Sequence, residues 1–480
     1  MRLLLLVVFL AHLVSGAVAA QVRPVRLATR PGNASAQSTA LLPDGRFAAV
    51  WMQGRTAFLQ YVDSNGAVAF GAPGRAVAPA PVTGVVGAVM VAHARDGVLV
   101  AVSRRIEQDK SRILVQWFDG QGNPRWGTGT YAAPVAGREE QREPFLLASS
   151  DGGGFVCFVR DATAFRGRRA VSCQRFSPEG QRLWGDEGAR GRDLSRLTAE
   201  EPKAVATGDG GLLVFWRDWN DYSSDASTVF LRGQRFGPDG VRQWGDDGTI
   251  VSRIYFPCDE NVCDVDTPWL SAVPDGSGGA ILAFDGRSGR VPEGTGLNRV
   301  FAQRMSAAGE RLWGDGVPVL PSLPPQHFYD LFVHPDGGAV VAVLTFPRAF
   351  VDGGVHLVLQ RLAADGRPLW PREGVTVVDL TSSPDSVYEG PIFGSVDGGV
   401  LRIAWDRTYI RSPRAEVHFS AFDAAGNRLT PGDGVPLVRT VLSDGGDSLV
   451  RGFAFDPASS TSFVVWDGAK GVAGVLYDPQ

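Results

Sequence analysis

Short apolar stretches separated by Gly-containing turns follow one another along the chain, and two phrases recur among them. The first phrase is Asp-Gly, often with a second Gly, followed by an apolar run. Its Asp residues are Asp44, Asp96, Asp151, Asp209, Asp275, Asp336 and Asp397, with Asp456 beginning an eighth, degenerate copy. Successive copies lie 52 to 66 residues apart, with a period close to 59. Asp-Gly is a strong turn signal, so each copy predicts a hairpin within a repeating unit.

The second phrase alternates with the first. It consists of an apolar strand ending in Arg-Phe or similar, a short turn ending in Gly, and a Trp four residues after that Gly. It is clearest at 175–186, 235–246 and 304–315, and weaker at 118–126, 361–370, 422–430 (where Thr430 replaces Trp) and 61–70. Together the two phrases divide each unit into four short strands, which we call A, B, C and D.

Strand B is often apolar on both faces, as in Leu212 to Trp216. A sheet that is apolar on both faces must be covered on both. No long stretch shows the helical periodicity that would supply this cover, so neighbouring sheets of the same kind must supply it. The sequence therefore predicts an all-β, eight-bladed β-propeller of four-stranded antiparallel blades.

The blade number follows from the ends of the repeat. The eighth unit has strands A to C between 449 and 477, but it has no strand D. An unassigned strand at 22–27 precedes the first strand A, and pairing it with the last unit would close the ring and remove open sheet edges. Seven blades is the alternative if the divergent first unit forms no full blade.

Residues 1–20 have the features of a secretory signal peptide: Arg2, a short apolar stretch, and a small-residue pattern at 17–19. We therefore expect residues 21–480 to form a single propeller domain that is secreted or periplasmic and not membrane-embedded. The formal net charge is −4 without any basic run, which argues against nucleic acid as a partner. Only Lys110, Lys203 and Lys470 are lysines among 47 basic residues, a skew typical of GC-rich bacterial genomes.

The repeat resembles the β-propeller repeats of exported bacterial proteins of undefined role. The residues that carry the resemblance are Asp275 to Gly279, Gln303-Arg304, and the step from Gly309 to Trp313. The Gly-x-x-x-Trp step is also distantly similar to the tryptophan-docking motif of quinoprotein-like propellers. The Thr that usually precedes the Gly is absent here, as are the adjacent cysteines of many quinone-binding enzymes, so the resemblance implies docking geometry without quinone binding.

In a propeller the A–B and C–D turns open on one face, and the B–C and D–A connections on the other. Here the second set varies in length, and variable loops on a rigid scaffold tend to bind ligands. We call this the loop face. Aromatic and Arg side chains are favoured at interfaces, so the candidate ligand- or partner-binding residues are Asp218, Trp219, Tyr222, Arg287, Tyr409 and Arg411. The alternative for Asp161, Asp218, Asp285, Asp406 and Asp467 is structural, with each capping its loop through an Asx turn.

The four cysteines predict disulfides in an exported chain. Cys157 and Cys173 fall on strands B and C of the third unit, where they face each other as a disulfide or a thiol pair. Cys258 and Cys263 would close a small acidic loop. Asp259, Glu260, Asp264 and Asp266 on that loop are candidate Ca²⁺ ligands, although the EF-hand spacing is absent and a solvated loop without metal is the alternative. No other cofactor is expected.

No nucleophile motif of the Gly-x-Ser-x-Gly type and no metal-binding His pair is present. We therefore expect a binding or scaffold module that holds a protein or a glycan at the cell envelope through the loop face. The alternative is a carbohydrate-active enzyme, a glycoside hydrolase or lyase, that uses carboxylates on the same face.

Overall fold

The computed structural model describes most of the chain after residue 20. The described residues are 21–28, 34–78, 84–93, 95–107, 110–134, 140–161, 169–193, 197–219, 228–255, 270–286, 299–321, 326–345, 356–379, 386–387, 392–409, 414–441, 450–468 and 471–479. Within these ranges the chain forms strands and turns, and no helix.

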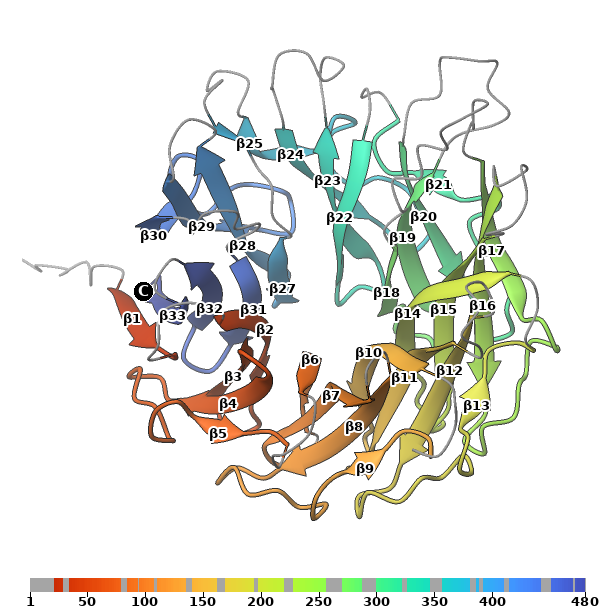
Figure 1. Ribbon diagram of the computed structural model, residues 1–480. Helices are drawn as coiled ribbons and strands as arrows, with labels where there is room; N and C mark the ends of the chain where they lie inside the picture. Colours follow the sequence, from red (N-terminus) through yellow and green to blue (C-terminus); the bar gives the residue numbers. More distant parts are fainter. Residues whose placement is uncertain are drawn as a thin grey trace, which may run out of the picture.

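Eight antiparallel sheets stand in a ring, as Figure 1 shows. The innermost strands, A, are β2 (Ala34–Leu41), β6 (Val85–Ala92), β10 (Glu140–Ala148), β14 (Thr198–Ala206), β18 (Leu270–Pro274), β22 (Gln326–Val333), β27 (Phe393–Asp397) and β31 (Val450–Asp456). Each of these strands touches the next, and β31 touches β2, so the ring is closed. The prediction of an eight-bladed propeller is confirmed.

The other strands follow outward in each blade. The B strands are β3 (Phe47–Gln53), β7 (Val98–Glu107), β11 (Gly154–Asp161), β15 (Leu212–Trp219), β19 (Ala280–Gly286), β23 (Ala339–Thr345), β28 (Val400–Tyr409) and β32 (Thr461–Gly468). The C strands are β4 (Thr56–Val62), β8 (Lys110–Phe118), β12 (Arg169–Phe176), β16 (Thr228–Phe236), β20 (Arg299–Met305), β24 (His356–Leu362), β29 (Arg414–Phe422) and β33 (Gly471–Asp478).

The outermost strands, D, are short in several blades. They are β5 (Arg75–Ala76), β9 (Thr130–Tyr131), β13 (Ala189–Arg190), β17 (Thr249–Tyr255), β21 (Val317–Pro318), β25 (Val375–Asp379), β30 (Val435–Val441) and β1 (Gln21–Arg26). Blade 7 also contains β26 (Ser386–Val387), which pairs with β28 beside β27.

The closing blade is built from both ends of the chain. β1 pairs antiparallel with β33 from Gln21↔Asp478 to Arg26↔Ala473, which completes the sheet of β31, β32 and β33. Val25 is buried in the core between blades 8 and 1. The N-terminal strand therefore occupies the place of strand D, as the sequence predicts.

Burial explains why the B strands are apolar throughout. All seven residues of β23 are buried, because one face packs against blade 5 and the other against blade 7. In blade 3, Cys157 of β11 lies directly opposite Cys173 of β12 and the two form a disulfide. This predicted pair is confirmed, and both cysteines are buried in the core between blades 3 and 4.

The recurring Trp joins one blade to the next, from blade 2 to blade 7, through what we call the Trp–Gly junction. In blade 5, the Trp313 ring packs on Gly366 in the C–D turn of blade 6, where a Cβ atom would lie 2.9 Å from the indole. Gly366 has a φ of +85°, which also favours glycine. Trp313 Nε1 donates to the Ala364 carbonyl (3.2 Å). The turn glycine is therefore required both by its backbone conformation and by the ring that covers it.

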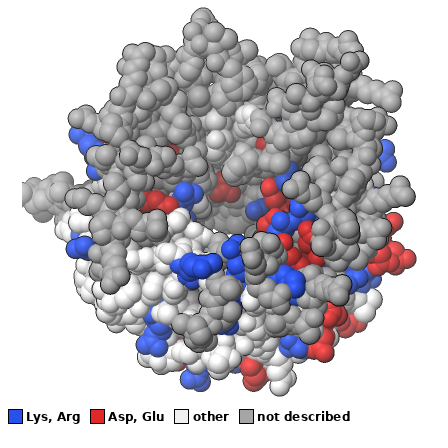
Figure 2. All heavy atoms as spheres, viewed as in Figure 1, with Lys and Arg blue, Asp and Glu red and all other residues white. Residues whose placement is uncertain are grey.

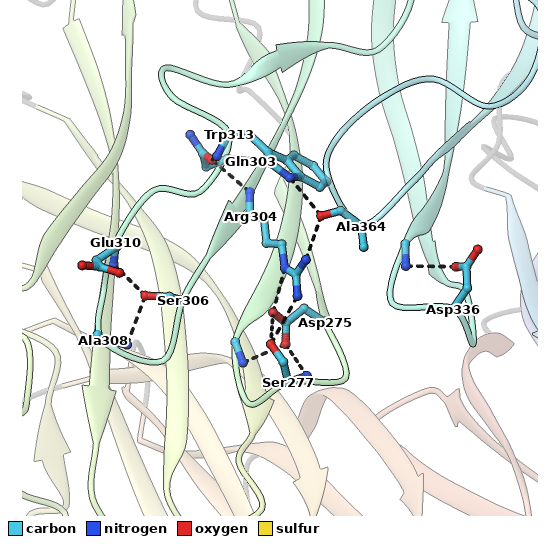
Figure 3. A network of polar contacts seen from close by, with 12 residues as sticks. Asp275, Ser277, Gln303, Arg304, Ser306, Ala308, Glu310, Trp313, Asp336 and Ala364 are labelled. Atoms are coloured by element: carbon cyan, nitrogen blue, oxygen red, sulfur yellow. Dashed lines mark hydrogen bonds and ion pairs between the residues drawn. The ribbon is translucent and has the colours of Figure 1, made fainter.

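Arg304 and Gln303 complete this junction (Figure 3). Arg304 donates to Asp275 of its own A–B turn at 2.9 Å and to the same Ala364 carbonyl at 2.7 Å. Gln303 fixes the Trp by accepting the Trp313 backbone N–H at 3.0 Å. Equivalent Trp Nε1 hydrogen bonds run from Trp126, Trp184, Trp244 and Trp370 to the carbonyls of Pro178, Pro238, Ala307 and Ala424.

The junction changes at the first blade and ends before the closing blade. Phe70 replaces Trp in blade 1 and packs on Gly122. Blade 7 carries Thr430 at the Trp position. Blade 8 has no C–D turn, because its strand D comes from the N-terminal segment. Among the described residues, Trp–Gly contacts therefore link blades 2 to 7, and blade 8 is held by strand pairing, by apolar packing and by hydrogen bonds from Asp467 to blade 1.

The Trp313 junction leads to a stability prediction. Trp313→Phe should destabilise the protein by about 1 kcal/mol, because it removes one hydrogen bond but keeps a ring on Gly366. Trp313→Ala should cost about 3–5 kcal/mol, because it removes a buried ring. Urea unfolding of the two variants measures the difference, and equal costs would contradict a main contribution from ring packing.

Candidate functional site

The loop face is where the B strands end and the A strands begin, so the candidate residues from the sequence cluster at that end. Trp219 is the last residue of β15 and Tyr409 the last of β28. Several predicted residues lie outside the described residues: Tyr222, Arg287 and Arg411, the predicted disulfide partners Cys258 and Cys263, and the predicted calcium ligands Asp259, Glu260, Asp264 and Asp266. Their predicted roles stay predictions.

Asp218 is fully buried and ties blade 3 to blade 4. Arg192, which follows β13, donates to both of its carboxylate oxygens at 2.9 Å. Arg232 Nε also lies 2.9 Å from Asp218 Oδ2, and Trp216 Nε1 donates to Oδ1. This carboxylate is enclosed by donors and has no exposure to solvent, so its visible role is to join blades, and its predicted ligand-binding role remains untested.

The sequence suggested that the five recurring Asp residues are equivalent, but they are not. The B strands of blades 4, 5 and 8 can be aligned by their pairing with strand C. The equivalent pairs are Leu212 with Phe236, Ala280 with Met305, and Ser462 with Tyr477. Counted from these positions, Asp285 and Asp467 fall at the same place, whereas Asp218 lies one residue further along its strand. Alternate residues of a strand point to opposite faces, so Asp218 faces the other side of its blade.

Asp285 and Asp467 bind the next blade, a role that the expectation of loop caps did not include. Asp467 accepts the Ala36 N–H of β2 at 2.6 Å, and Asp285 accepts the Phe328 N–H of β22 at 2.6 Å. Both N–H groups lie beside a β-bulge in strand A, after which pairing resumes at Ser38 and Asp330. A bulge disrupts the ladder locally, and a buried N–H needs a partner. A carboxylate of the preceding blade supplies it.

Blades 3 and 4 build this bulge differently, from a Glu-Pro pair. Glu143-Pro144 interrupts β10 between Arg142 and Phe145, and Glu201-Pro202 interrupts β14 between Glu200 and Lys203. Proline is tolerated at a bulge because no ladder hydrogen bond is lost there. Both glutamates have positive φ, +54° and +53°. Left-handed backbone is costly for residues other than glycine and is characteristic of functional or tightly constrained sites.

The two bulges are connected to each other. Glu201 occupies the register position of Ala36 and Phe328, and its N–H is accepted by Glu143 Oε2 at 3.1 Å. Glu143 thus replaces the Asp of the other blades. The Glu201 carboxylate pairs with Arg217 at 2.8 Å. Burial raises the pKa of Glu201, against the opposing charges of Arg217 and Lys203.

Charged side chains around the two bulges form a continuous network at the loop-face end of the strands. Asp161 pairs with Arg142 at 3.4 Å and with Arg169 at 3.3 Å. Arg169 also pairs with Glu200, which lies 3.8 Å from Arg217. Figure 2 shows acidic and basic side chains gathered beside the central hollow, over the region of β10 and β14. The network fixes the bulge side chains at the channel mouth.

A cavity of about 370 Å³ lies between the two bulges. It is lined by Glu143, Pro144, Phe145, Glu201, Pro202, Lys203 and Leu270. Two carboxylates, an ammonium and an aromatic ring therefore share one space with apolar walls. Its volume falls at the lower end of the range for small-molecule sites.

Asp330 extends this charged surface along the inner side of the ring. It has the same register position in blade 6 as Lys203 in blade 4, and the Lys203 charge acts on it. Burial nevertheless raises the pKa of Asp330 to about 7.

None of the cavity residues was predicted from the sequence. The available signal was Glu-Pro at the same place in two successive A strands, where proline is unusual. In the part of the chain that the structure describes, no three His, Cys, Asp or Glu side chains are placed to hold a metal. No helix among the described residues is long and apolar enough to cross a membrane.

No protein family and no curated protein matches the sequence. Solved structures with a related chain path include a puromycin hydrolase (TM-score 0.47, 14% identity), which covers 92% of this chain. The chain spans only 59% of that hydrolase. An ulvan lyase, a polysaccharide lyase, has a TM-score of 0.44 at 10% identity and covers 80% of this chain and 93% of its own.

An α-L-arabinanase from Penicillium chrysogenum has a TM-score of 0.39 at 14% identity, covering 68% of this chain and 94% of its own. Likenesses of this degree carry no conclusion about activity. The class to which the chain belongs is therefore defined by its own fold: an eight-bladed β-propeller with a closing blade shared between its two ends.

The raised pKa of Asp330 predicts a pH dependence of stability. Because the folded state favours the protonated carboxyl, the free energy of unfolding should fall as pH rises from about 4 through about 7. Asp330→Asn stays neutral and can still accept the Leu331 N–H. We expect this variant to be more stable than wild type at pH 8 by about 2 kcal/mol, allowing for residual solvent in the channel.

At pH 4 the advantage of Asp330→Asn should shrink toward zero, because the wild-type carboxyl is then protonated in the folded state. Chemical denaturation of both proteins at the two pH values measures this. A variant that is no more stable than wild type at pH 8 would contradict the burial cost assigned to Asp330.

Proposed function

We propose that this propeller is an exported binding module that holds a glycan at the loop-face end of its central channel. The observation that carries the proposal is the cavity between the Glu-Pro bulges of blades 3 and 4. Its carboxylates can accept hydrogen bonds from hydroxyl groups, and Phe145, Pro144 and Pro202 offer apolar surface to the C–H face of a sugar ring. A sugar ring carries hydroxyl groups at its edge and C–H groups on its face, so its binding site needs both hydrogen-bond acceptors and apolar surface.

A protein partner is less well supported by this geometry. Specific protein interfaces bury roughly 800 Å² on each side, whereas the cavity is small and recessed between two strands. Export is supported by the signal-like residues 1–20 and by the Cys157–Cys173 disulfide, a bond that persists in oxidising compartments.

A glycan array probed with the purified mature protein tests the proposal. Phe145→Ala should weaken retention about tenfold or more, because it removes the aromatic wall of the cavity. Leu312→Ala is the matched control, since Leu312 is an exposed apolar residue that follows the C–D turn of blade 5, at the opposite end of the strands from the cavity. Thermal melting of both variants excludes misfolding.

Unchanged glycan binding by Phe145→Ala would contradict this location of the site. If wild type binds no glycan but captures an envelope protein, and a Trp219/Tyr409 double alanine variant loses it, the protein-binding alternative replaces the proposal.

A second candidate function is glycan cleavage, because Glu143 and Glu201 line one cavity and burial raises the pKa of Glu201. Glycoside hydrolysis uses two carboxyl groups, one of them a general acid whose pKa is raised. If the protein cleaves a bound glycan, Glu201→Gln should lower the rate by at least about 100-fold. Measurement of new reducing ends decides this, and cleavage that persists in Glu201→Gln would remove the glutamate from the reaction.

A further inference from the structure

Lys203 differs from the other charged side chains of the cavity in having no ion-pair partner among the described residues. Glu201 pairs with Arg217 at 2.8 Å, and Glu143 faces Arg142 at 3.9 Å while accepting the Glu201 N–H. Among the described residues, no carboxylate lies within 4.0 Å of the Lys203 ammonium. Its nearest described contact is the Phe145 ring, with Nζ 5.6 Å from the ring centre.

The position of Lys203 places its ammonium group on the inner side of the propeller. It is the first residue to resume pairing after the bulge of β14, the place that Phe145, Ser38 and Asp330 occupy in their own blades. Its side chain lines the cavity together with Phe145. Asp330 responds to the Lys203 charge from blade 6, two blades away, so their interaction runs along the inner side of β18.

The choice of residue type points the same way. Three arginines, Arg142, Arg169 and Arg217, hold the ion pairs around the bulges. Lys203, one of only three lysines in the chain, stands where no such pair forms. Arginine suits fixed, planar pairing with a carboxylate, whereas lysine provides a compact and hydrated point charge.

Resting on the proposed function, we infer that Lys203 binds an anionic substituent of the ligand, so that the glycan is an acidic one bearing carboxylate or sulfate groups. Each cavity carboxylate has a cationic neighbour that offsets its repulsion of an anionic ligand, Arg217 at 2.8 Å from Glu201 and Arg142 at 3.9 Å from Glu143. Glu143 and Glu201 remain available to accept hydrogen bonds from the sugar hydroxyls. Lys203 is thus the residue that separates acidic from neutral glycans.

Binding measurements with two variants test this assignment. The array contains three matched sets of oligosaccharides: uronate-containing, sulfated and neutral. Lys203→Met keeps the length and the apolar contact with Phe145, and it should lower affinity for acidic members by about 10- to 100-fold, a much larger loss than for neutral members. Lys203→Arg should restore most of the loss. The first two sets show which anion is bound.

Chemical protection gives an independent readout. With only three lysines in the chain, acetylation of each can be followed by mass spectrometry of the peptides released by proteolysis. The tightest acidic oligosaccharide should slow acetylation of Lys203 but not of Lys110, at the start of β8 in blade 2. This readout needs no variant and does not depend on folding of a mutant protein.

The outcomes separate the two proposals. Preference for neutral glycans, equal loss of acidic and neutral binding in Lys203→Met, or no protection of Lys203 would overturn the role of Lys203 and leave glycan binding in place. Failure of wild type to bind any member of the array would overturn the proposed function itself.

Discussion

The ring depends on twisted sheets meeting face to face at a fixed offset, and the Trp–Gly junctions set that offset between successive blades from blade 2 to blade 7. The Trp313 indole and the Arg304 guanidinium donate to one acceptor, Ala364, from the same blade. An apolar face alone is non-directional and tolerates sliding. Two hydrogen-bond donors on one carbonyl group, together with an indole ring packed on a glycine, prevent such sliding. The large apolar interfaces between blades are therefore held in one register.

The candidate site arises from the same demand for satisfied polar groups, at the opposite end of the blades. Each described bulge in strand A leaves N–H groups that the neighbouring blade must satisfy. Blades 8 and 5 do so with Asp467 and Asp285, which lie on strand B. Blade 3 does so with Glu143 from strand A itself. Moving the carboxylate to the inner strand places it at the channel, where it also lines a cavity.

The architecture could be predicted from the sequence because each blade repeats the same pattern of turn glycines, an apolar B strand and a Trp at constant spacing. The closing strand could be predicted because a sheet edge must be covered. The site could not. Glu143, Glu201 and Lys203 come together only because two bulges in adjacent blades face one another, and strand register decides this. The same register separates Asp218 from Asp285 and Asp467, although their local sequences look alike.

The pairing of the two chain ends in blade 8, which we call the seam, differs from the other strand pairings in how it forms during folding. Gln21 and Asp478 pair although 457 positions separate them, so this contact carries the largest loop-closure entropy in the described sheets. Contacts of such sequence separation form late and slowly. Neither junction of blade 8 contains the Trp–Gly contact that braces blades 2 to 7. We therefore expect the pairing of the two chain ends in blade 8 to be a late step in folding.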